Sequence, residues 1–307
     1  MQSRAPKAFD PDDPASLPVV HLVSAGEAVY AGQIHRAWRA LVQSPGSVEP
    51  AIPVVLKHMD SHVRLAMELG CSLAAHALKL PVPRGMLVLA NPAELRGLPE
   101  AARPLSGRSE VLCYGSVLRW PEDTAERGIE DDSRGEDFIW ERFCSTKTAA
   151  PGAAWDELVA NDDRHTRNFI FDGSRYWLID HELALRPLAD TVRQMAQAAT
   201  RQLIIDHRAA RNQVATQLRS RRPADHGMLI QPPVFLARKK ALDALVHQMQ
   251  AWRTDTPSLD AVLSDSETIV RGIILRLPAL GEQLTRRIST TGGPLLWESS
   301  TESSNNR

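Results

Sequence analysis

Residues 169–171 and 176–179 are two short runs of aromatic and β-branched side chains, joined by an Asp-Gly-Ser sequence at 172–174. Such runs favour β-strands, and Asp-Gly tolerates the positive φ angles that tight turns require. The segment therefore predicts a β-hairpin, and the polar residues that flank it must lie close together wherever the chain places them.

The open end of this hairpin carries polar side chains. Asn168 enters the first strand and is expected opposite Trp177 or Leu178, and Asp180 leaves the second strand. Because neighbouring strands lie about 4.8 Å apart, Asp163, Asn168 and Asp180 can converge there. Two carboxylates and a carboxamide are hard oxygen ligands, which suit Mg²⁺ and not zinc.

The spacing of these residues is that of a phosphoryl-transfer site. Protein kinases place a catalytic Asp five residues before a metal-binding Asn, and a second metal-binding Asp follows a short hairpin. Asp163 stands five residues before Asn168, and Asp180 follows the hairpin. Asp162 stands six residues before Asn168 and remains the alternative base.

A lysine in an apolar strand adds to this pattern. Lys57 ends the predicted strand 53–57 in a chain that has few lysines, and burying its ammonium alone would cost several kcal/mol. Glu68 lies on the apolar face of a helix predicted between Ser61 and Pro81. Kinases use a strand lysine and a helix glutamate in this order to hold the α and β phosphates, so Lys57 and Glu68 are expected to pair.

The run Asn-Asp-Asp-Arg-His-Thr-Arg-Asn at 161–168 resembles the catalytic loop of HipA-like kinases and of the wider phosphatidylinositol-kinase-like group. The Leu-Pro-Val-Pro run at 80–83 adds a weaker likeness, and the resemblance covers about residues 19–190. The second aspartate is followed by His181-Glu182 in place of Phe-Gly, so nothing about the activation switch of ordinary protein kinases transfers.

The resemblance implies a role for each residue of the motif. They are Asp163 as the base, Asn168 and Asp180 as Mg²⁺ ligands, Lys57 as the phosphate-binding residue, and Arg164 and His165 as supports of the loop. It also implies a protein-kinase-like fold.

The expected fold class is α+β, with a small β-rich N-lobe and a mostly α-helical C-lobe. Apolar runs bounded by Gly or Pro predict strands at 19–23, 53–57 and 85–89, and helical patterns dominate from Leu183 to Ile288. The expected divisions are a flexible N-terminus at 1–18, an N-lobe at 19–117, a C-lobe at 118–288 and a flexible C-terminus at 289–307.

The nucleotide-covering part of the site has a weaker signal. The predicted strand 111–115 is a candidate hinge, in which Cys113 and Gly115 would meet the adenine edge; a buried edge of the sheet would have the same sequence pattern. No Gly-x-Gly-x-x-Gly precedes the strand lysine, and Gly26 and Gly32 are the nearest candidates for a turn over the phosphates.

The predicted function is transfer of the ATP γ-phosphoryl group to a hydroxyl acceptor, with a protein Ser/Thr as the favoured acceptor class and with ATP and Mg²⁺ bound. Two alternatives remain. One is a nucleotide-binding, pseudokinase-type module without turnover. The other is a metal-dependent phosphoesterase in which Asp163, Asp180 and His181 gather metals.

The composition indicates the cellular environment and the kinds of binding partner that we expect. The chain has 36 basic and 37 acidic residues, so it carries no excess positive charge to bind a nucleic acid. Its three cysteines form neither a disulfide framework nor a Cys-x-x-Cys pair. No run approaches the roughly 18 apolar residues of a membrane span. We therefore expect a cytoplasmic protein with no membrane partner.

Overall fold

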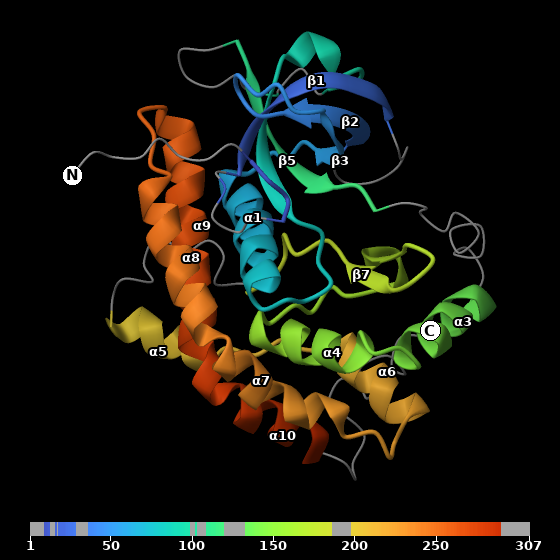
Figure 1. The fold of residues 1–307 in the computed structure, drawn as a ribbon. Helices are drawn as coiled ribbons and strands as arrows, with labels where there is room; N and C mark the ends of the chain where they lie inside the picture. The colour runs from blue at the N-terminus through green and yellow to red at the C-terminus, as the bar shows by residue number, and fades with distance from the viewer. Residues whose placement is uncertain are drawn as a thin grey trace, which may run out of the picture.

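The computed structural model describes residues 9–12, 16, 18–28, 36–98, 102, 109–119, 133–185 and 198–289. The N-terminal strands lie at the top of the view in Figure 1, and the helices of the second half lie below and beside them. The molecule combines a small strand-rich part with a larger helical part.

Five strands form the N-terminal part: β1 (Val19–Ala28), β2 (Ala37–Gln43), β3 (Ile52–Lys57), β4 (Gly85–Ala90) and β5 (Val111–Val117). Their order is β1-β2-β3-β5-β4, and the sheet closes into a barrel because β1 pairs with β4 in parallel. The other four pairings are antiparallel.

Strand β2 was not among the strands that the sequence predicted. Its inward side chains Trp38, Ala40 and Val42 alternate with exposed Arg39 and Leu41, which is the period of a half-buried strand. The exposed leucine breaks the apolar-polar alternation in the sequence, so the sequence pattern alone does not predict a strand here.

The flexibility expected for residues 1–18 stays a prediction, but Phe9 in this segment is buried. Its ring is 5% exposed and packs into the barrel core. Its backbone N–H donates to Ser44 Oγ at 2.8 Å, beyond the end of β2. A single aromatic residue in a polar segment can find a buried site that the composition of the segment does not reveal.

Helix α1 (His62–Ala77) joins the barrel to the helical part. Ser61 caps its N-terminus, as predicted from sequence, by accepting from the backbone N–H of Arg64. The helix packs along α9 (Pro257–Arg276), where a Cβ on Gly70 would lie only 3.0 Å from the Ile269 side chain. Glycine at this position allows the two helices to approach closely.

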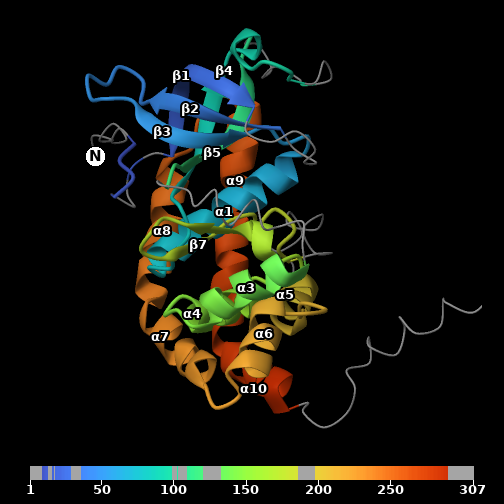
Figure 2. The ribbon, with the colours of Figure 1, turned by 90° about the vertical axis from the view of Figure 1, so that its right-hand side faces the viewer.

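The second half contains a hairpin and further helices. They are α3 (Ser133–Cys144), α4 (Ala149–Leu158), β6 (Phe169–Phe171), β7 (Tyr176–Leu178), α5 (Ala198–Asp206), α6 (Gln213–Arg221), α7 (Gln231–Ala237), α8 (Lys239–Ala251) and α10 (Leu280–Ser289). Figure 2 shows the β6–β7 hairpin between the barrel and α4. No helix among the described residues is both long and apolar enough to cross a membrane.

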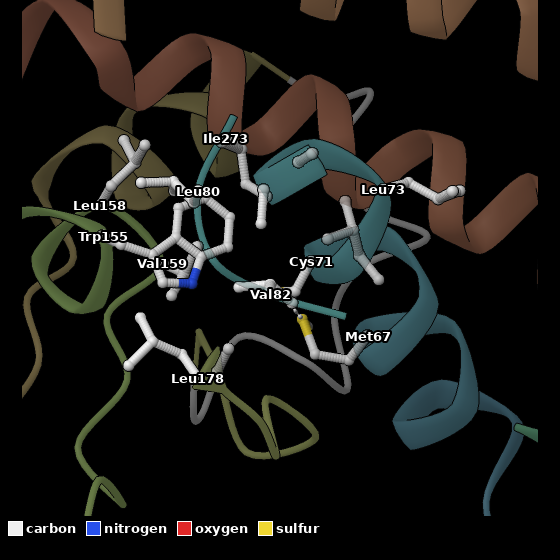
Figure 3. Packing of buried hydrophobic residues seen from close by; sticks show 14 of the residues in the cluster. Met67, Cys71, Leu73, Leu80, Val82, Trp155, Leu158, Val159, Leu178 and Ile273 are labelled. Atoms are coloured by element: carbon white, nitrogen blue, oxygen red, sulfur yellow. Dashed lines mark hydrogen bonds between the residues drawn. The ribbon is translucent and has the colours of Figure 1, made fainter. Parts of the chain in front are cut away.

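The main hydrophobic core lies where α1, α4, α9 and β7 meet. Figure 3 shows side chains from these elements and from the segment after α1 in one cluster, which includes Met67, Cys71, Leu80, Val82, Trp155, Leu158, Leu178 and Ile273. This core fixes the hairpin and the end of α4 against α1, and these are the elements that carry the predicted site residues.

Candidate active site

The segment that follows α4 is held by its own polar side chains. Ala160 has a φ of 46°, which turns the chain sharply out of the helix. Asn161 Oδ1 then accepts from the backbone N–H of Asp163 at 3.1 Å. Asn168 Nδ2 donates to the backbone carbonyl of Asp163 at 3.0 Å. The loop is thus fixed on both sides of Asp163, whose own side chain is half-buried.

The hairpin forms with a register different from the predicted one. Phe169 pairs with Leu178 and Phe171 with Tyr176, so Asn168 lies opposite Ile179 and not opposite Trp177 or Leu178. The reason is the turn, which includes residue 175 and is closed by a backbone hydrogen bond between Asp172 and Arg175. The longer turn moves each pairing along the second strand.

Arg164, predicted as a loop support, is buried, and its guanidinium donates to one carboxylate and to two backbone carbonyls. Its guanidinium forms two hydrogen bonds to the Asp156 carboxylate, at 3.1 and 3.0 Å. It also donates to the carbonyls of Asn168 and Ile179, at 3.1 and 2.5 Å. Arg164 therefore ties the end of α4 to both strands of the hairpin, and Asp180 follows directly.

His181 completes this buried cluster. The Trp155 indole N–H donates to His181 Nε2 at 3.0 Å, and Arg164 Nη2 lies 3.1 Å from the same nitrogen. Two donors on Nε2 assign the ring proton to Nδ1. Burial, together with the charges of Arg164 and Lys57, holds the pKa of His181 well below its ordinary value, so the ring is neutral. We call Trp155, Asp156, Arg164 and His181 the rear network.

Lys57 reaches from the barrel to the segment after β7. Its Nζ lies 2.9 Å from Asp180 Oδ1, with a hydrogen bond, and 2.9 Å from Glu182 Oε2 as an ion pair whose angles fall short of a hydrogen bond. Burial acts to lower the pKa of Lys57, but the neighbouring carboxylates, led by that of Asp180, outweigh it and raise the pKa. The lysine is therefore a permanently charged group at this site.

The expected pairing of Lys57 with Glu68 is not what the structure shows. Glu68 Oε2 accepts from the backbone N–H of His181 at 2.5 Å, and Glu182 lies at Lys57 in its place. Burial and the charge of Asp180 raise the pKa of Glu68 to about 8, against the opposing effect of the lysine. Sequence placed Glu68 on the correct buried face but could not tell which donor it meets.

Asp180 itself has a strained backbone. Its φ is 65°, in the left-handed region that a non-glycine residue occupies at a cost of about 1–2 kcal/mol. Its side chain is one-third exposed, whereas that of Asn168 is buried. Strain held at a charged, partly exposed residue is typical of functional sites.

Two further predicted residues lie around the loop. Asp162 is half-buried, and its carbonyl accepts from Arg211 Nε at 3.0 Å. His165 is exposed as a residue, but partial desolvation of its ring lowers its pKa, and the carboxylates of Asp163 and Asp180 oppose that change. The placement of Asp163 and Asp180 around one site stays a prediction.

Strand β5 carries the candidate adenine contacts. Cys113 and Gly115 lie inside β5, where Cys113 packs in the barrel core and Gly115 pairs with strands on both sides. The sheet pairs the backbone of Gly115 on both sides and that of Cys113 with β4 alone, so the adenine contact stays a prediction. Gly26 lies within β1, and Gly32 is outside the described residues.

The sequence reasoning missed Trp155, Asp156 and Glu182. The first two stand on α4, six and five residues before the loop at 161–168, where a Trp-Asp pair has no distinctive spacing. Glu182 is the acid two residues after Asp180. The Asp-x-Glu pattern at 180–182 is the signal that could have indicated a second carboxylate beside Lys57.

No family model and no curated protein matches the chain. Among solved structures, it is similar to a proinflammatory kinase of Helicobacter pylori, CtkA, with a TM-score of 0.53 and 10% sequence identity. The alignment covers 86% of this chain and 96% of that one. The fold is kinase-like. At this identity the likeness establishes the kinase-like fold alone, and the chemistry must be argued from the residues of this chain.

Proposed function

We propose that the protein is an ATP-dependent kinase of the HipA-like type, which transfers the γ-phosphoryl group of ATP to a hydroxyl, with protein Ser/Thr as the favoured acceptor class. The observation that carries the proposal is the contact between Lys57 and Asp180, 123 residues apart in sequence. It joins a strand lysine of the barrel to the aspartate that follows the hairpin, which is the arrangement that kinases use around a triphosphate.

Asp163 is the proposed base. Its backbone is fixed by Asn161 and Asn168, while its half-buried carboxylate remains accessible to a substrate. In this position the carboxylate orients the acceptor hydroxyl and accepts its proton as the oxygen attacks the γ-phosphorus. Lys57, charged and held at the centre of the site, offsets the negative charge of the phosphates.

The residues fit a magnesium ion. Asn168 uses its Nδ2 to bind Asp163, which leaves its carbonyl oxygen Oδ1 as the atom available to a metal. Asp180 uses Oδ1 to bind Lys57, and its Oδ2 accepts from none of the described residues. A carboxylate and a carboxamide oxygen match the preference of Mg²⁺. When bound, Mg²⁺ supplies charge neutralisation at the β and γ phosphates.

The phosphoesterase alternative lacks support from the geometry. It needs His181 as a metal ligand, but Nε2 of that ring already receives the indole N–H of Trp155 and faces Arg164, and the ring is fully buried. Among the described ranges, no group of three or more His, Cys, Asp or Glu side chains is arranged to hold a metal ion.

The proposal is tested by incubating the purified protein with Mg-ATP labelled at the γ position, alone and with a lysate as the source of acceptors. We expect labelled protein from the wild type. Asp163→Asn should reduce labelling by about 10²–10⁴-fold while binding of ATP persists. Asp162→Asn is the matched control, because its carboxylate is one residue away and its loop contact uses the backbone carbonyl.

Three outcomes separate the candidates. Labelling that Asp163→Asn removes and Asp162→Asn keeps supports the kinase. ATP binding without any labelling supports the nucleotide-binding module. Loss in Asp162→Asn with retention in Asp163→Asn transfers the role of base to the neighbouring residue.

A further inference from the structure

Lys57 has two carboxylate partners that differ in their surroundings. Asp180 and Glu182 both lie 2.9 Å from its Nζ, but the Asp180 side chain is 33% exposed and that of Glu182 only 8%. A carboxylate that is open to solvent can exchange one partner for another, whereas a buried one must keep a compensating charge. The two ion pairs are therefore not equivalent.

Asp180 is the partner that must be shared. Under the proposed function its carboxylate binds Mg²⁺ when the nucleotide is present, and a metal-bound carboxylate is a weaker partner for an ammonium. Lys57 would then need another carboxylate to stay in place. In protein kinases the helix glutamate meets this need.

Glu68, the helix glutamate of this chain, is already engaged elsewhere. Its Oε2 accepts from the backbone N–H of His181, and its Oε1 lies 4.0 Å from the ring nitrogen Nδ1 of the same residue. Both of its oxygens face His181. Glu68 therefore orders the chain between Asp180 and Glu182. Its charge raises the pKa of Lys57 more than that of Glu182 does, but of the two glutamates Glu182 is the one that contacts the ammonium, at 2.9 Å.

Glu182 is well placed to hold the lysine. Its Oε1 lies 4.0 Å from Arg64 Nη1 on α1, so the carboxylate spans two cations. The backbone around it is fixed, because the N–H of Ala184 donates to His181 and the N–H of Leu185 donates to Val159. A buried carboxylate on a fixed backbone can keep its position when the neighbouring aspartate changes partner.

We propose that Glu182 is the positioning residue that holds Lys57 in place when Asp180 binds the metal–nucleotide complex, the task that the helix glutamate performs in protein kinases. This inference rests on the proposed function for its purpose, but the contact it describes can be tested without activity. It places the anchor of the lysine after β7, beside the catalytic loop, and not on α1.

The test removes the Asp180 carboxylate by mutation and measures whether the Lys57 amine remains protected by its other ion pair. An amine in ion pairs reacts slowly with an acylating reagent, so modification of Lys57 by a succinimidyl ester at one fixed pH, read by peptide mass spectrometry, reports its release. Exposed Lys240 in the same sample is the internal reference. Asp180→Asn alone should leave Lys57 protected.

Two double variants then compare the glutamates. Asp180→Asn with Glu182→Gln should raise Lys57 modification by about fivefold over Asp180→Asn, an effect in the range for residues in direct contact. Asp180→Asn with Glu68→Gln should change it by less than about twofold. An increase already complete in Asp180→Asn, or equal increases in the two double variants, overturns the proposal.

A kinetic measurement covers the case in which a double variant does not fold. In the single variant Glu182→Gln we expect kcat to fall by about tenfold or more with a smaller change in the KM for ATP, because the phosphates are still bound but less well oriented. Glu182→Asp should recover part of kcat, and Glu282→Gln, an exposed glutamate on α10, serves as the control. Unchanged kcat in Glu182→Gln overturns the proposal.

The two proposals fail in different ways. If the wild type neither binds nor turns over ATP, the proposed function fails, and the modification experiment still decides which carboxylate holds Lys57. If the wild type is active and the modification of Lys57 does not depend on Glu182, only the positioning role fails.

Discussion

The charged front of the site, made of Lys57, Asp163 and Asp180, and the rear network contain similar polar side chains but differ in how exposed these side chains are. In the front, Lys57, Asp163 and Asp180 are each partly accessible, and at least one carboxylate oxygen of Asp180 accepts from none of the described residues. In the rear network, Arg164 directs its donors to Asp156, to two backbone carbonyls and toward His181. All polar side-chain atoms of the rear network except His181 Nδ1 bond within the protein, whereas Asp180 at the front keeps a carboxylate oxygen for a ligand.

The backbone conformation of Asp180 at the front depends on the rear network. Asp180 keeps a strained φ of 65° because Ile179 before it is bound to Arg164, and His181 after it is bound to Glu68 and Trp155. A buried network of hydrogen bonds can hold a neighbour in a costly conformation. Substitutions in the rear should therefore act on folding, and substitutions in the front should act on binding and turnover.

The largest effect is expected from Asp156→Ala. It leaves the Arg164 guanidinium buried without its carboxylate, which should lower the free energy of unfolding by about 3–5 kcal/mol. Urea denaturation followed by circular dichroism measures it. Asp243→Ala removes an exposed ion pair with Lys239 and should cost less than about 1 kcal/mol. Equal losses of unfolding free energy in the two variants would contradict the expected difference between the buried rear network and an exposed ion pair.

Lys57→Met should act on the ligand and less on the fold. Loss of a charged hydrogen-bond donor to phosphate should weaken ATP binding by about 10- to 100-fold. Stability should fall less than in Asp156→Ala, since Glu182 keeps Arg64 nearby. Isothermal titration with Mg-ATP gives the affinity, and Lys239→Met is the exposed control. Unchanged affinity would contradict the placement of phosphates at the front.

Trp155→Phe makes a smaller change in the rear network. The ring stays in the core, but the indole N–H no longer donates to His181 Nε2, which keeps Arg164 as its other neighbour. The expected loss is about 1 kcal/mol of unfolding free energy, with ATP affinity preserved. A thermal melt with and without nucleotide measures both. A large loss of affinity with little loss of stability would show that the rear contributes directly to binding.

The smallest effect is expected at the hairpin tip, outside both regions. Burial acts to raise the pKa of Asp172, but hydrogen bonds from Ser174, Trp177 and Arg175 outweigh it and lower the pKa. A lowered pKa in the folded state stabilises the protein above the ordinary pKa near 4, and this stabilisation is lost as pH falls. Asp172→Asn should cost about 0.5–1 kcal/mol at pH 7. The difference from wild type should shrink below pH 4, and a constant difference would contradict the assignment.

Local patterns were sufficient for much of the architecture. The Asp-Gly turn with its flanking aromatics predicted the hairpin, and the three- and four-residue spacing after Ser61 predicted α1 with its cap. Apolar runs predicted three strands of the barrel. These features depend on neighbours along the chain, where turn chemistry, capping and periodicity act.

The site was predicted only as a set of residues. Loop spacing selected Asp163, Asn168 and Asp180, and the rarity of lysine singled out Lys57. Their roles stay predictions. Sequence could not foresee that Glu182 would take the lysine, because a pair made across 125 positions depends on how β3 and the chain after β7 are brought together.

Interactions between neighbours along the chain set the short-range elements: where the hairpin turns, where α1 begins, and which acids stand around the loop. Packing between distant segments set the closure of the barrel, in which β5 pairs with β3 and β4, and the burial of His181 against Trp155. Hydrogen bonding between neighbours is set by spacing, whereas the choice among several carboxylates for one lysine is set by which of them lose water when the core packs.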